Sequence, residues 1–278
     1  MILVEQLAKS YGAVHAVRDL SFSVPAGQIL GLVGPNGAGK TTTLRCLVGI
    51  LRPTAGSITI CGLSLADHPV EVKSQLAFIP DEPQLFDSLT VEEHLRFIGR
   101  LYNVADVEAR IGPLLSELEL DDRRRSFPEE LSRGMKQKLA TACGLIHDPR
   151  VLILDEPLTG LDPAAIRRMK VTILARARAG VSIILSSHLL TLVEELCDRI
   201  LVLQNGRRVA LGTVPEIVAE HPTLAGRPLE DVFLALTGQS EAGGPTAYAL
   251  PHHGTPPPPT PAVVDEQPAD HPGSSQEQ

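Results

Sequence analysis

The sequence predicts an α/β fold built around a parallel β-sheet, and three observations support this prediction. Short apolar runs at 29–33, 151–154 and 181–185 have the length of strands that are covered on both faces. Segments with a helical spacing of apolar residues separate these runs along the chain. Gly34, Asp155 and His188 follow these three runs directly or closely. In an open parallel sheet, ligands bind beyond the carboxyl ends of the strands, where these residues would converge.

A glycine-rich loop lies between the first apolar run and the helix expected after it. Glycines let the backbone wrap an anion closely with several N–H groups turned inward, and the positive end of the next helix favours phosphate there. Lys40 is expected to reach the β- and γ-phosphates, and the Thr41 hydroxyl to coordinate Mg²⁺. The loop therefore predicts a nucleoside triphosphate site, in preference to a glycine-rich turn that binds nothing. Its residues are Gly34, Pro35, Asn36, Gly37, Ala38, Gly39, Lys40, Thr41 and Thr42.

Residues 1–62 are predicted to form short strands and turns around this loop. Ile2–Ala8 and Leu20–Val24 alternate roughly as strands do, and Ser57–Ile60 is a further strand. Tyr11 lies in the turn after the first of them. An exposed aromatic ring there could stack on a base, but without further context an ordinary surface or packing tyrosine is favoured.

From Pro80 to Pro149 the pattern changes to helices. Thr90 to Glu93 forms a capping box at the start of one helical pattern. A second pattern covers 106–120, and Gly112-Pro113 is predicted to interrupt it. Ser132 is well placed as the N-cap of a helix that extends over 136–146.

The later part of the chain returns to strands. Asp162-Pro163 predicts the start of a helix by the preferences for the N-cap and first helical position. Asn205-Gly206, between apolar runs at 200–203 and 207–211, predicts a hairpin with a type I′ turn. The segment 229–234 is the last predicted helix.

After about Gly238 the composition changes to Pro, Gly, Thr, Ser, His and acidic residues. Such a segment cannot bury enough apolar surface to offset its ordering entropy, so residues 239–278 are predicted to be a disordered tail. Seven acidic residues and no Lys or Arg follow Arg227. The whole chain has a formal charge of −8, whereas the part up to Arg227 has a charge of about −1. A nearly neutral body gives no electrostatic footprint for nucleic acid, and we expect no such partner.

A disulfide-linked or zinc-binding protein, a secreted protein and a membrane-spanning protein are also disfavoured. The four cysteines are scattered and form no C-x-x-C pair, as expected for reduced core residues in a cytosolic protein. The first residues show no charged segment or cleavage pattern of a signal peptide. The apolar runs are too short to span a bilayer, so a membrane function is expected to require a partner.

Asp155 and Glu156 follow the apolar run at 151–154 and carry the predicted chemistry. Phosphoryl transfer from ATP to water needs positioning, charge neutralisation and an oriented nucleophile. Asp155 is suited to hold Mg²⁺ through its water shell, and Glu156 to act as general base on the attacking water. A capped strand end is the alternative for this pair taken alone. The phosphate loop upstream favours catalysis, and His188, which follows 181–185, is expected to converge on the same edge.

Five segments occur in the order found in ATP-binding cassette (ABC) proteins. The chain therefore resembles the nucleotide-binding subunit of an ABC transporter, of the single-cassette exporter type, over residues 1–238. The segment around Ser132 and Gly134 discriminates this family from other NTPases. The five segments are 34–42, Leu131-Ser-Arg-Gly-Met-Lys-Gln137, Leu152-Ile-Leu-Asp-Glu-Pro157, Gly160-Leu-Asp162 and Ser186-Ser-His188.

The resemblance implies a P-loop NTPase core with a parallel sheet, an N-terminal antiparallel β subdomain and a helical subdomain at about 82–148. It implies that two cassettes pair head to tail around two ATP molecules. Ser132 and Gly134 would then face the nucleotide of the other copy, and Asp162 would link the two sites. It also implies that Tyr11 stacks on adenine and that His188 contacts the γ-phosphate.

Two positions depart from the family pattern. The family usually has Gln at the position of Asp81, where a carboxylate can still hold a Mg²⁺-bound water but would repel the γ-phosphate. Its signature usually reads Ser-Gly-Gly-Gln, whereas this chain has Ser-Arg-Gly-Met from Ser132 to Met135. Both departures are also met in exporter-type relatives.

The sequence thus predicts an ATPase that uses ATP and Mg²⁺, dimerises with itself or a related cassette, and drives a separate membrane permease. It is expected to be cytoplasmic and attached to the membrane through that permease. Leu85, Phe86 and Leu89 are the candidate contacts, with local packing as the equal alternative for them. The alternative is a soluble cassette ATPase that acts as a regulatory or assembly switch and transports nothing.

Overall fold

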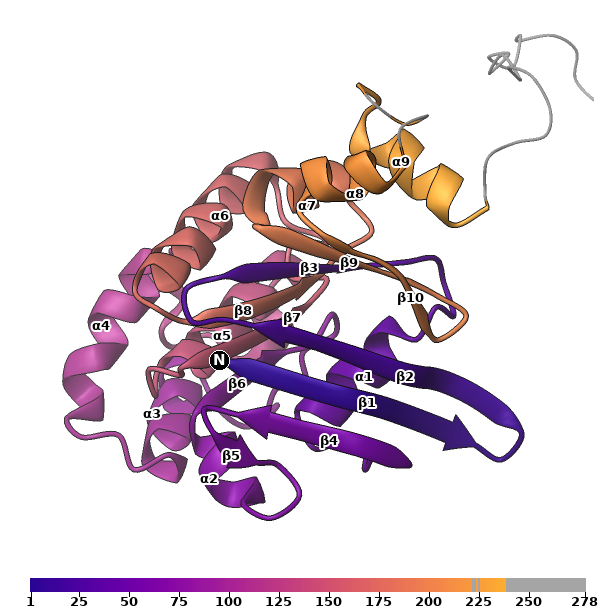
Figure 1. Ribbon diagram of the computed structural model, residues 1–278. Coiled ribbons are helices and arrows are strands. Elements are labelled where there is room, and N and C mark those ends of the chain that lie inside the picture. The colour runs from indigo at the N-terminus through magenta and orange to yellow at the C-terminus, as the bar shows by residue number, and fades with distance from the viewer. Residues whose placement is uncertain (222–223, 225, 239–278) are drawn as a thin grey trace, which may run out of the picture. The chain divides into compact units, whose positions relative to one another are not determined.

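The computed structural model describes residues 1–221, 224 and 226–238, and the predicted disordered tail at 239–278 lies outside them. Two β-sheets form the framework of the described residues, one with six strands and one with four. The two sheets lie next to each other, with helices around them (Figure 1).

The six-stranded sheet has the strand order β10-β9-β3-β8-β7-β6. All neighbouring strands in it are parallel except the hairpin of β9 and β10. Every residue of β3, β7 and β8 is buried, as expected for strands covered on both faces. The predicted parallel sheet is confirmed. Its strands are β3 (Ile29–Val33), β6 (Leu76–Ile79), β7 (Val151–Asp155), β8 (Ser182–Ser186), β9 (Arg199–Gln204) and β10 (Arg207–Gly212).

The hairpin turn follows the prediction closely. Asn205 and Gly206 have φ angles of 49° and 75°. Positive φ at both central residues is what a type I′ turn requires, and Asn and Gly tolerate it best.

The four-stranded sheet is antiparallel, as predicted, with the order β2-β1-β4-β5. Its strands are β1 (Ile2–Tyr11), β2 (Val14–Val24), β4 (Ala55–Ile60) and β5 (Leu63–Ser64). The strand ranges predicted for β1 and β2 were too short. Gln6 has a φ of 49°, and the pairing of β1 with β2 shifts register between Val4 and Leu7. Such an irregularity breaks the alternation of side chains, so the alternation alone stops before the strand does.

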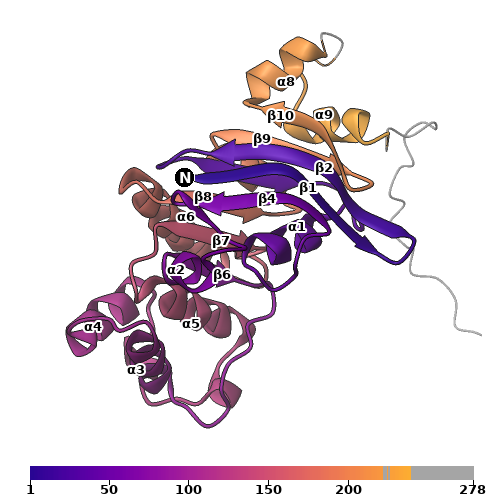
Figure 2. The same ribbon diagram turned by 60° about the horizontal axis from the view of Figure 1, so that its bottom comes forward.

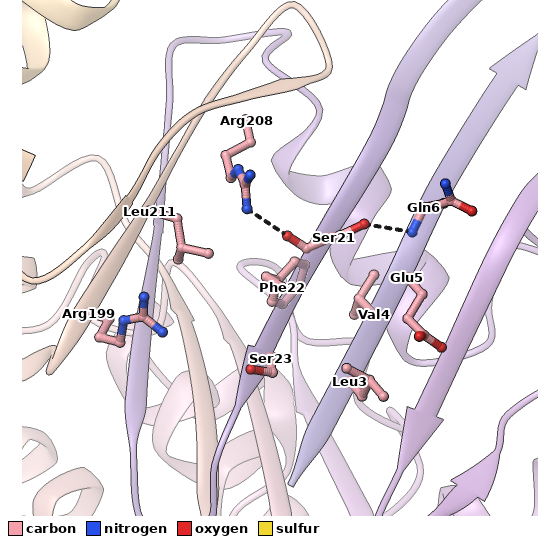
Figure 3. A pocket seen from close by; sticks show the side chains of 10 residues that line it. All are labelled: Leu3, Val4, Glu5, Gln6, Ser21, Phe22, Ser23, Arg199, Arg208 and Leu211. Carbon is pink, nitrogen blue, oxygen red and sulfur yellow. Dashed lines mark hydrogen bonds between the residues drawn. The ribbon is translucent and has the colours of Figure 1, made fainter. Parts of the chain in front are cut away.

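A buried apolar cluster joins the two sheets. Helix α1 (Lys40–Leu47) contributes Leu44 and Leu47 to it, together with Leu7 from β1 and Leu32 from β3. At the surface, Arg208 of β10 donates a 3.1 Å hydrogen bond to the carbonyl oxygen of Ser21 in β2. This bond crosses an open groove of about 430 Å³ between the sheets (Figure 3).

The opposite face of the six-stranded sheet is covered by helices from the second half of the chain. Met169 and Ile173 pack in one cluster with Ile183 and Leu185 of β8. Figure 1 shows these helices together beside β3, β8 and β9. They are α6 (Pro163–Arg178), α7 (Leu190–Leu196), α8 (Val214–Glu220) and α9 (Leu229–Leu236), the last of which is two residues longer than predicted.

A group of helices beside β6 is formed by residues between 91 and 145 (Figure 2). It contains α3 (Val91–Leu101), α4 (Val107–Glu117) and α5 (Arg133–Leu145), and the short helix α2 (Pro69–Ser74) precedes β6. The capping box is confirmed: Thr90 and Glu93 satisfy each other's backbone N–H groups.

The predicted interruption at Gly112-Pro113 is wrong, because α4 continues through Pro113. Proline removes one backbone hydrogen bond and disfavours the helix locally. However, Ile111, Leu114 and Leu115 of the same helix are buried in the apolar cluster, and this burial outweighs the loss.

Candidate nucleotide site

The phosphate loop follows β3 and ends at the first residue of α1, Lys40. It passes very close to neighbouring backbone: a Cβ added at Gly34 would lie 2.4 Å from the carbonyl oxygen of Leu203, and one at Gly39 2.4 Å from that of Ala16. Gly39 also has a φ of 104°. Only glycine fits these two positions, and the bare backbone they leave is what close contact with phosphate oxygens requires.

The Lys40 ammonium is folded back over this loop. Its Nζ donates hydrogen bonds to the carbonyl oxygens of Gly34, at 2.6 Å, and Pro35, at 3.2 Å. Burial lowers the pKa of Lys40, while the charges of Glu156 and Asp155 oppose that shift. A half-buried cation therefore lies between the loop and the two carboxylates, where it can neutralise phosphate.

Asp155 is the last residue of β7 and is 7% exposed. Asp155 pairs with Ser186 across the sheet, and Ser186 pairs with Leu32 of β3, so the ends of the three strands are level. Burial is the main cause that raises the pKa of Asp155, and the negative charge of Asp81 raises it further. The convergence expected at the carboxyl ends of the strands is thus present in the fold.

Glu156 lies in the sharp turn after β7. Its φ is 50°, and its backbone N–H donates a 3.0 Å bond to the carbonyl oxygen of Ser186. A left-handed conformation is unusual for glutamate and is held here by the surrounding structure. The turn places the carboxylate beside His188: Glu156 Oε2 accepts from the backbone N–H of His188 at 3.3 Å and lies 2.8 Å from its Nδ1.

The Glu156 carboxylate and the His188 ring contact each other but differ in how far solvent reaches them. Burial raises the pKa of Glu156, and the interactions with His188 oppose that increase. The side chain of His188 is 61% exposed, whereas that of Glu156 is 17% exposed. A carboxylate in this setting can accept a proton, and the exposed imidazole can donate a hydrogen bond to an anion in front of it.

The donors available for Mg²⁺ are oxygens, which this ion prefers. The described residues contain no group of three or more His, Cys, Asp or Glu side chains that could hold a metal by themselves. Thr41 and Asp155 fit an ion that keeps waters and takes further ligands from phosphates, as Mg²⁺ commonly does.

Ser132 caps α5, as predicted, by accepting a 3.3 Å hydrogen bond from the backbone N–H of Met135. The helix begins at Arg133, three residues earlier than predicted. Gly134 packs tightly on the segment 160–161, since a Cβ there would lie 3.1 Å from the carbonyl oxygen of Gly160. Among the described residues, no hydrogen bond connects Ser132 or Gly134 to the phosphate loop of the same chain.

Asp162 is the N-cap of α6, as the sequence predicts. Its Oδ1 accepts from the backbone N–H groups of Ala164 and Ala165, both at 2.9 Å. These bonds lower the pKa of Asp162. Tyr11 ends β1 with 48% of its surface exposed, and the Lys9 ammonium lies 5.2 Å from its ring centre. An exposed ring of this kind is available for stacking.

Asp81 forms an ion pair that sequence reasoning missed. Its Oδ1 lies 3.0 Å from Nη2 of Arg133 at the start of α5. One turn further along α5, Gln137 Nε2 donates a 3.3 Å bond to the carbonyl oxygen of Pro80. The available signal was that each of the two departures from the family pattern introduces a charged residue, the acidic Asp81 and the basic Arg133.

Comparison with known proteins places the chain in a family. A family profile described as "ABC transporter" matches residues 17–159, which is more than half of the chain. The chain belongs to the ABC transporter family. The phosphate loop and the segments around Ser132 and Asp155 lie inside the matched range, and the resemblance drawn from them is confirmed.

Relatives support the same assignment for this cassette. It is 36% identical over 245 residues to the ABC-type transporter ATP-binding protein EcsA of Bacillus subtilis. The aligned residues cover 87% of this chain and 98% of EcsA. It is 39% identical over 220 residues to the Nod factor export ATP-binding protein I of Ralstonia nicotianae, covering 78% of this chain and 68% of that protein. The chain is thus an ATP-binding cassette of the ABC transporter ATPase family.

Solved structures show the same fold. A structure described as the ATP-binding subunit of an ABC transporter superposes with a TM-score of 0.81 at 38% identity, covering 85% of this chain and 99% of that one. A second, described as a dimeric post-hydrolysis cassette bound to ADP and Pi, has a TM-score of 0.72 at 20% identity and shows the fold alone. Across the residues described for the cassette, we find no helix with the length and apolar character that crossing a membrane requires.

Proposed function

We propose that this cassette hydrolyses Mg-ATP between two copies that pair head to tail, and thereby powers a separate membrane permease that acts as an exporter. The main support for the proposal is the contact between Glu156 and His188. It lies at the carboxyl edge of the six-stranded sheet, where Lys40 bonds the carbonyl oxygen of Gly34 in the phosphate loop. The proposal assigns residues 1–238 to the cassette, with a helical subdomain at about 82–148.

Each residue at this edge has a proposed part in ATP hydrolysis. The backbone and side chains of 34–42 bind the phosphates, and Lys40 neutralises the β- and γ-phosphates. Thr41 and Asp155 would hold Mg²⁺, and Asp81 would hold a water bound to it. The ion would supply further neutralisation of phosphate charge. Glu156 accepts a proton from the attacking water, and His188 donates a hydrogen bond to the γ-phosphate.

A second copy is proposed to complete the site. Ser132 and Gly134 lie at the N-terminus of α5, a helix of 13 residues whose positive end favours an anion. Within the part of the chain that the structure describes, no hydrogen bond joins them to their own phosphate loop, and they are proposed to face the γ-phosphate held by the partner. Tyr11 is proposed to stack on adenine, and Asp162 to link the two sites.

A first prediction concerns how the ATPase activity falls at low pH, which is the acid limb of its pH profile. Glu156 acts as a base only when ionised, so turnover falls as the pH falls through its pKa, which burial has raised. His188 opposes that rise, so replacing it by alanine moves the acid limb of the residual activity to higher pH. The pH dependence of kcat/KM for Mg-ATP in both proteins tests this, because kcat/KM reports the pKa of the base in the free enzyme. A limb that stays in place, or moves to lower pH, would contradict the assigned base.

The proposed permease site is an apolar groove beside β6. It has a volume of about 260 Å³ and includes Phe86, His94 and Ile98 in its lining. Phe86 is 50% exposed and packs edge to face with Phe97, which is itself 44% exposed. Exposed aromatic side chains beside a groove are typical of a protein contact. Through this contact the chain would be held at the cytoplasmic face of the membrane.

Phe86→Asp tests this contact, because it places a charge in an apolar groove. We expect the full-length protein purified from membranes to bring an integral-membrane protein with it, and F86D to lose that protein. Val171→Asp is the matched control, since Val171 is 67% exposed on α6, outside the groove. Thermal midpoints of both variants check folding. If F86D and V171D retain the membrane protein equally, the groove is not the contact.

The names of the relatives support export as the direction. Several similar proteins are called Nod factor export ATP-binding proteins, and another is called a linearmycin resistance ATP-binding protein. A protein that turns over ATP but never associates with a membrane component would instead favour the regulatory switch.

A further inference from the structure

Three segments of the cassette meet at the side chain of Arg133. Its guanidinium binds Asp81, which follows β6. Its aliphatic stem lies against Gly160, where an added Cβ would be 3.0 Å from Arg133 Cδ. Arg133 itself is the first residue of α5, between Ser132 and Gly134.

The position of Asp81 creates an electrostatic problem. Asp81 follows β6, whose last residue, Ile79, pairs with Leu154 of β7, so Asp81 lies at the edge that carries Asp155 and Glu156. Its negative charge also acts on Asp155. A triphosphate adds several negative charges to this edge. An unpaired carboxylate at position 81 would therefore repel the nucleotide. Arg133 is the one residue to which a described ion pair joins Asp81.

The contact between α5 and this segment has a second part. Gln137, one turn after Arg133, is buried and donates to the carbonyl oxygen of Pro80. Arg133 and Gln137 therefore lie on one side of α5 and bond consecutive residues. These two bonds connect the segment of Pro80 and Asp81 to the first two turns of α5.

We propose that Arg133 is a positioning residue: it neutralises Asp81 beside the metal site and couples Asp81 to the start of α5. The inference rests on the proposed function, because it assumes that nucleotide binds at this edge. The pairing explains how the chain accommodates a carboxylate at position 81. The compensating positive charge is that of Arg133, in the signature segment of the same chain.

A double-mutant cycle in the full-length protein tests the coupling. The variants are Arg133→Gln, Asp81→Asn and the double variant, with Arg133→Lys to retain the charge. Arg168→Gln is the matched control, because Arg168 is also 57% exposed and pairs with Glu119. The readouts are KM and kcat for Mg-ATP, the Mg²⁺ concentration for half-maximal activity, the Kd for Mg-ATP and the thermal midpoint.

We expect R133Q to raise KM, Kd and the Mg²⁺ requirement about twofold to fivefold, the range of an exposed ion pair. Its thermal midpoint is expected to match wild type, because such pairs add little to stability. R133K should recover most of the loss. In the D81N background R133Q should add nothing, because the charge it offsets is gone, and R168Q should behave as wild type.

Three results would overturn the inference alone. The first is additive effects of R133Q and D81N, and the second is a wild-type KM, Kd and Mg²⁺ requirement for R133Q in a chain that hydrolyses ATP. A lower thermal midpoint without any change in Kd would also overturn it, since that indicates a structural role. A wild-type chain that binds but does not hydrolyse ATP would overturn the proposed function, and the Kd cycle would still decide the coupling. A chain that does neither overturns both.

Discussion

Replacing Glu156 by glutamine is expected to reduce kcat by a factor of about 100 to 10,000, the usual contribution of a general base. Glutamine has the same shape and keeps a hydrogen-bonding oxygen, but it cannot accept the proton of the attacking water. The phosphate loop and Lys40 are untouched, so ATP affinity is expected to be close to that of wild type. Steady-state turnover and equilibrium binding of Mg-ATP measure the two quantities separately.

The same variant also reports on the dimer. If ATP holds two copies together and hydrolysis releases them, a protein that binds but does not hydrolyse will accumulate as a dimer. Size-exclusion chromatography with light scattering, with and without Mg-ATP, measures this directly. Glu194→Gln is the control, because Glu194 is exposed on α7 and should leave turnover and assembly unchanged. A strictly monomeric E156Q, or turnover within tenfold of wild type, would argue against the mechanism.

Lys40→Ala is expected to weaken ATP binding about tenfold to 150-fold, which corresponds to about 1.5–3 kcal/mol for hydrogen bonds to a charged group. Among the described residues, the hydrogen bonds of this ammonium go to two carbonyl oxygens of the phosphate loop, those of Gly34 and Pro35. Folding should therefore survive its removal. Isothermal titration with Mg-ATP gives the change in affinity.

A thermal shift experiment provides a second measure for this variant. A ligand that binds only the folded state stabilises it by an amount that grows with the logarithm of one plus the ratio of ligand concentration to Kd. Wild type should gain stability with ATP, whereas K40A should gain little at the same concentration. Lys170→Ala is the control, because Lys170 pairs with Glu195 on the surface. Equal affinity of K40A and wild type would show that the loop binds nucleotide without this cation.

Both predictions concern buried charged residues at the carboxyl edge of the six-stranded sheet. Burial shifts the pKa of Lys40 downward and those of Asp155 and Glu156 upward. These are shifts toward the neutral forms, and they mark groups that are held out of water without being fully neutralised. Bound phosphate and Mg²⁺ would supply the missing partners.

Several parts of this protein were determined by the sequence alone. The parallel sheet follows from apolar runs long enough to cross a buried layer, and the phosphate loop follows from the spacing of its glycines before Lys40 and Thr41. The caps at Thr90, Ser132 and Asp162 follow from short-range hydrogen bonding. All of these depend on residues close together in the chain, which is why their spacing predicts them.

The tertiary structure decided what depends on distant residues. Helix α4 continues through Pro113 because its neighbours are buried against other helices. Glu156 meets His188, and Asp81 meets Arg133, across separations of 32 and 52 residues. The sequence supplied the charges of each pair, but a through-space contact between two side chains is set by the packing of the elements that carry them. The chemistry of the residues could therefore be predicted from the chain, whereas the ion pair that balances Asp81 could be found only in the fold.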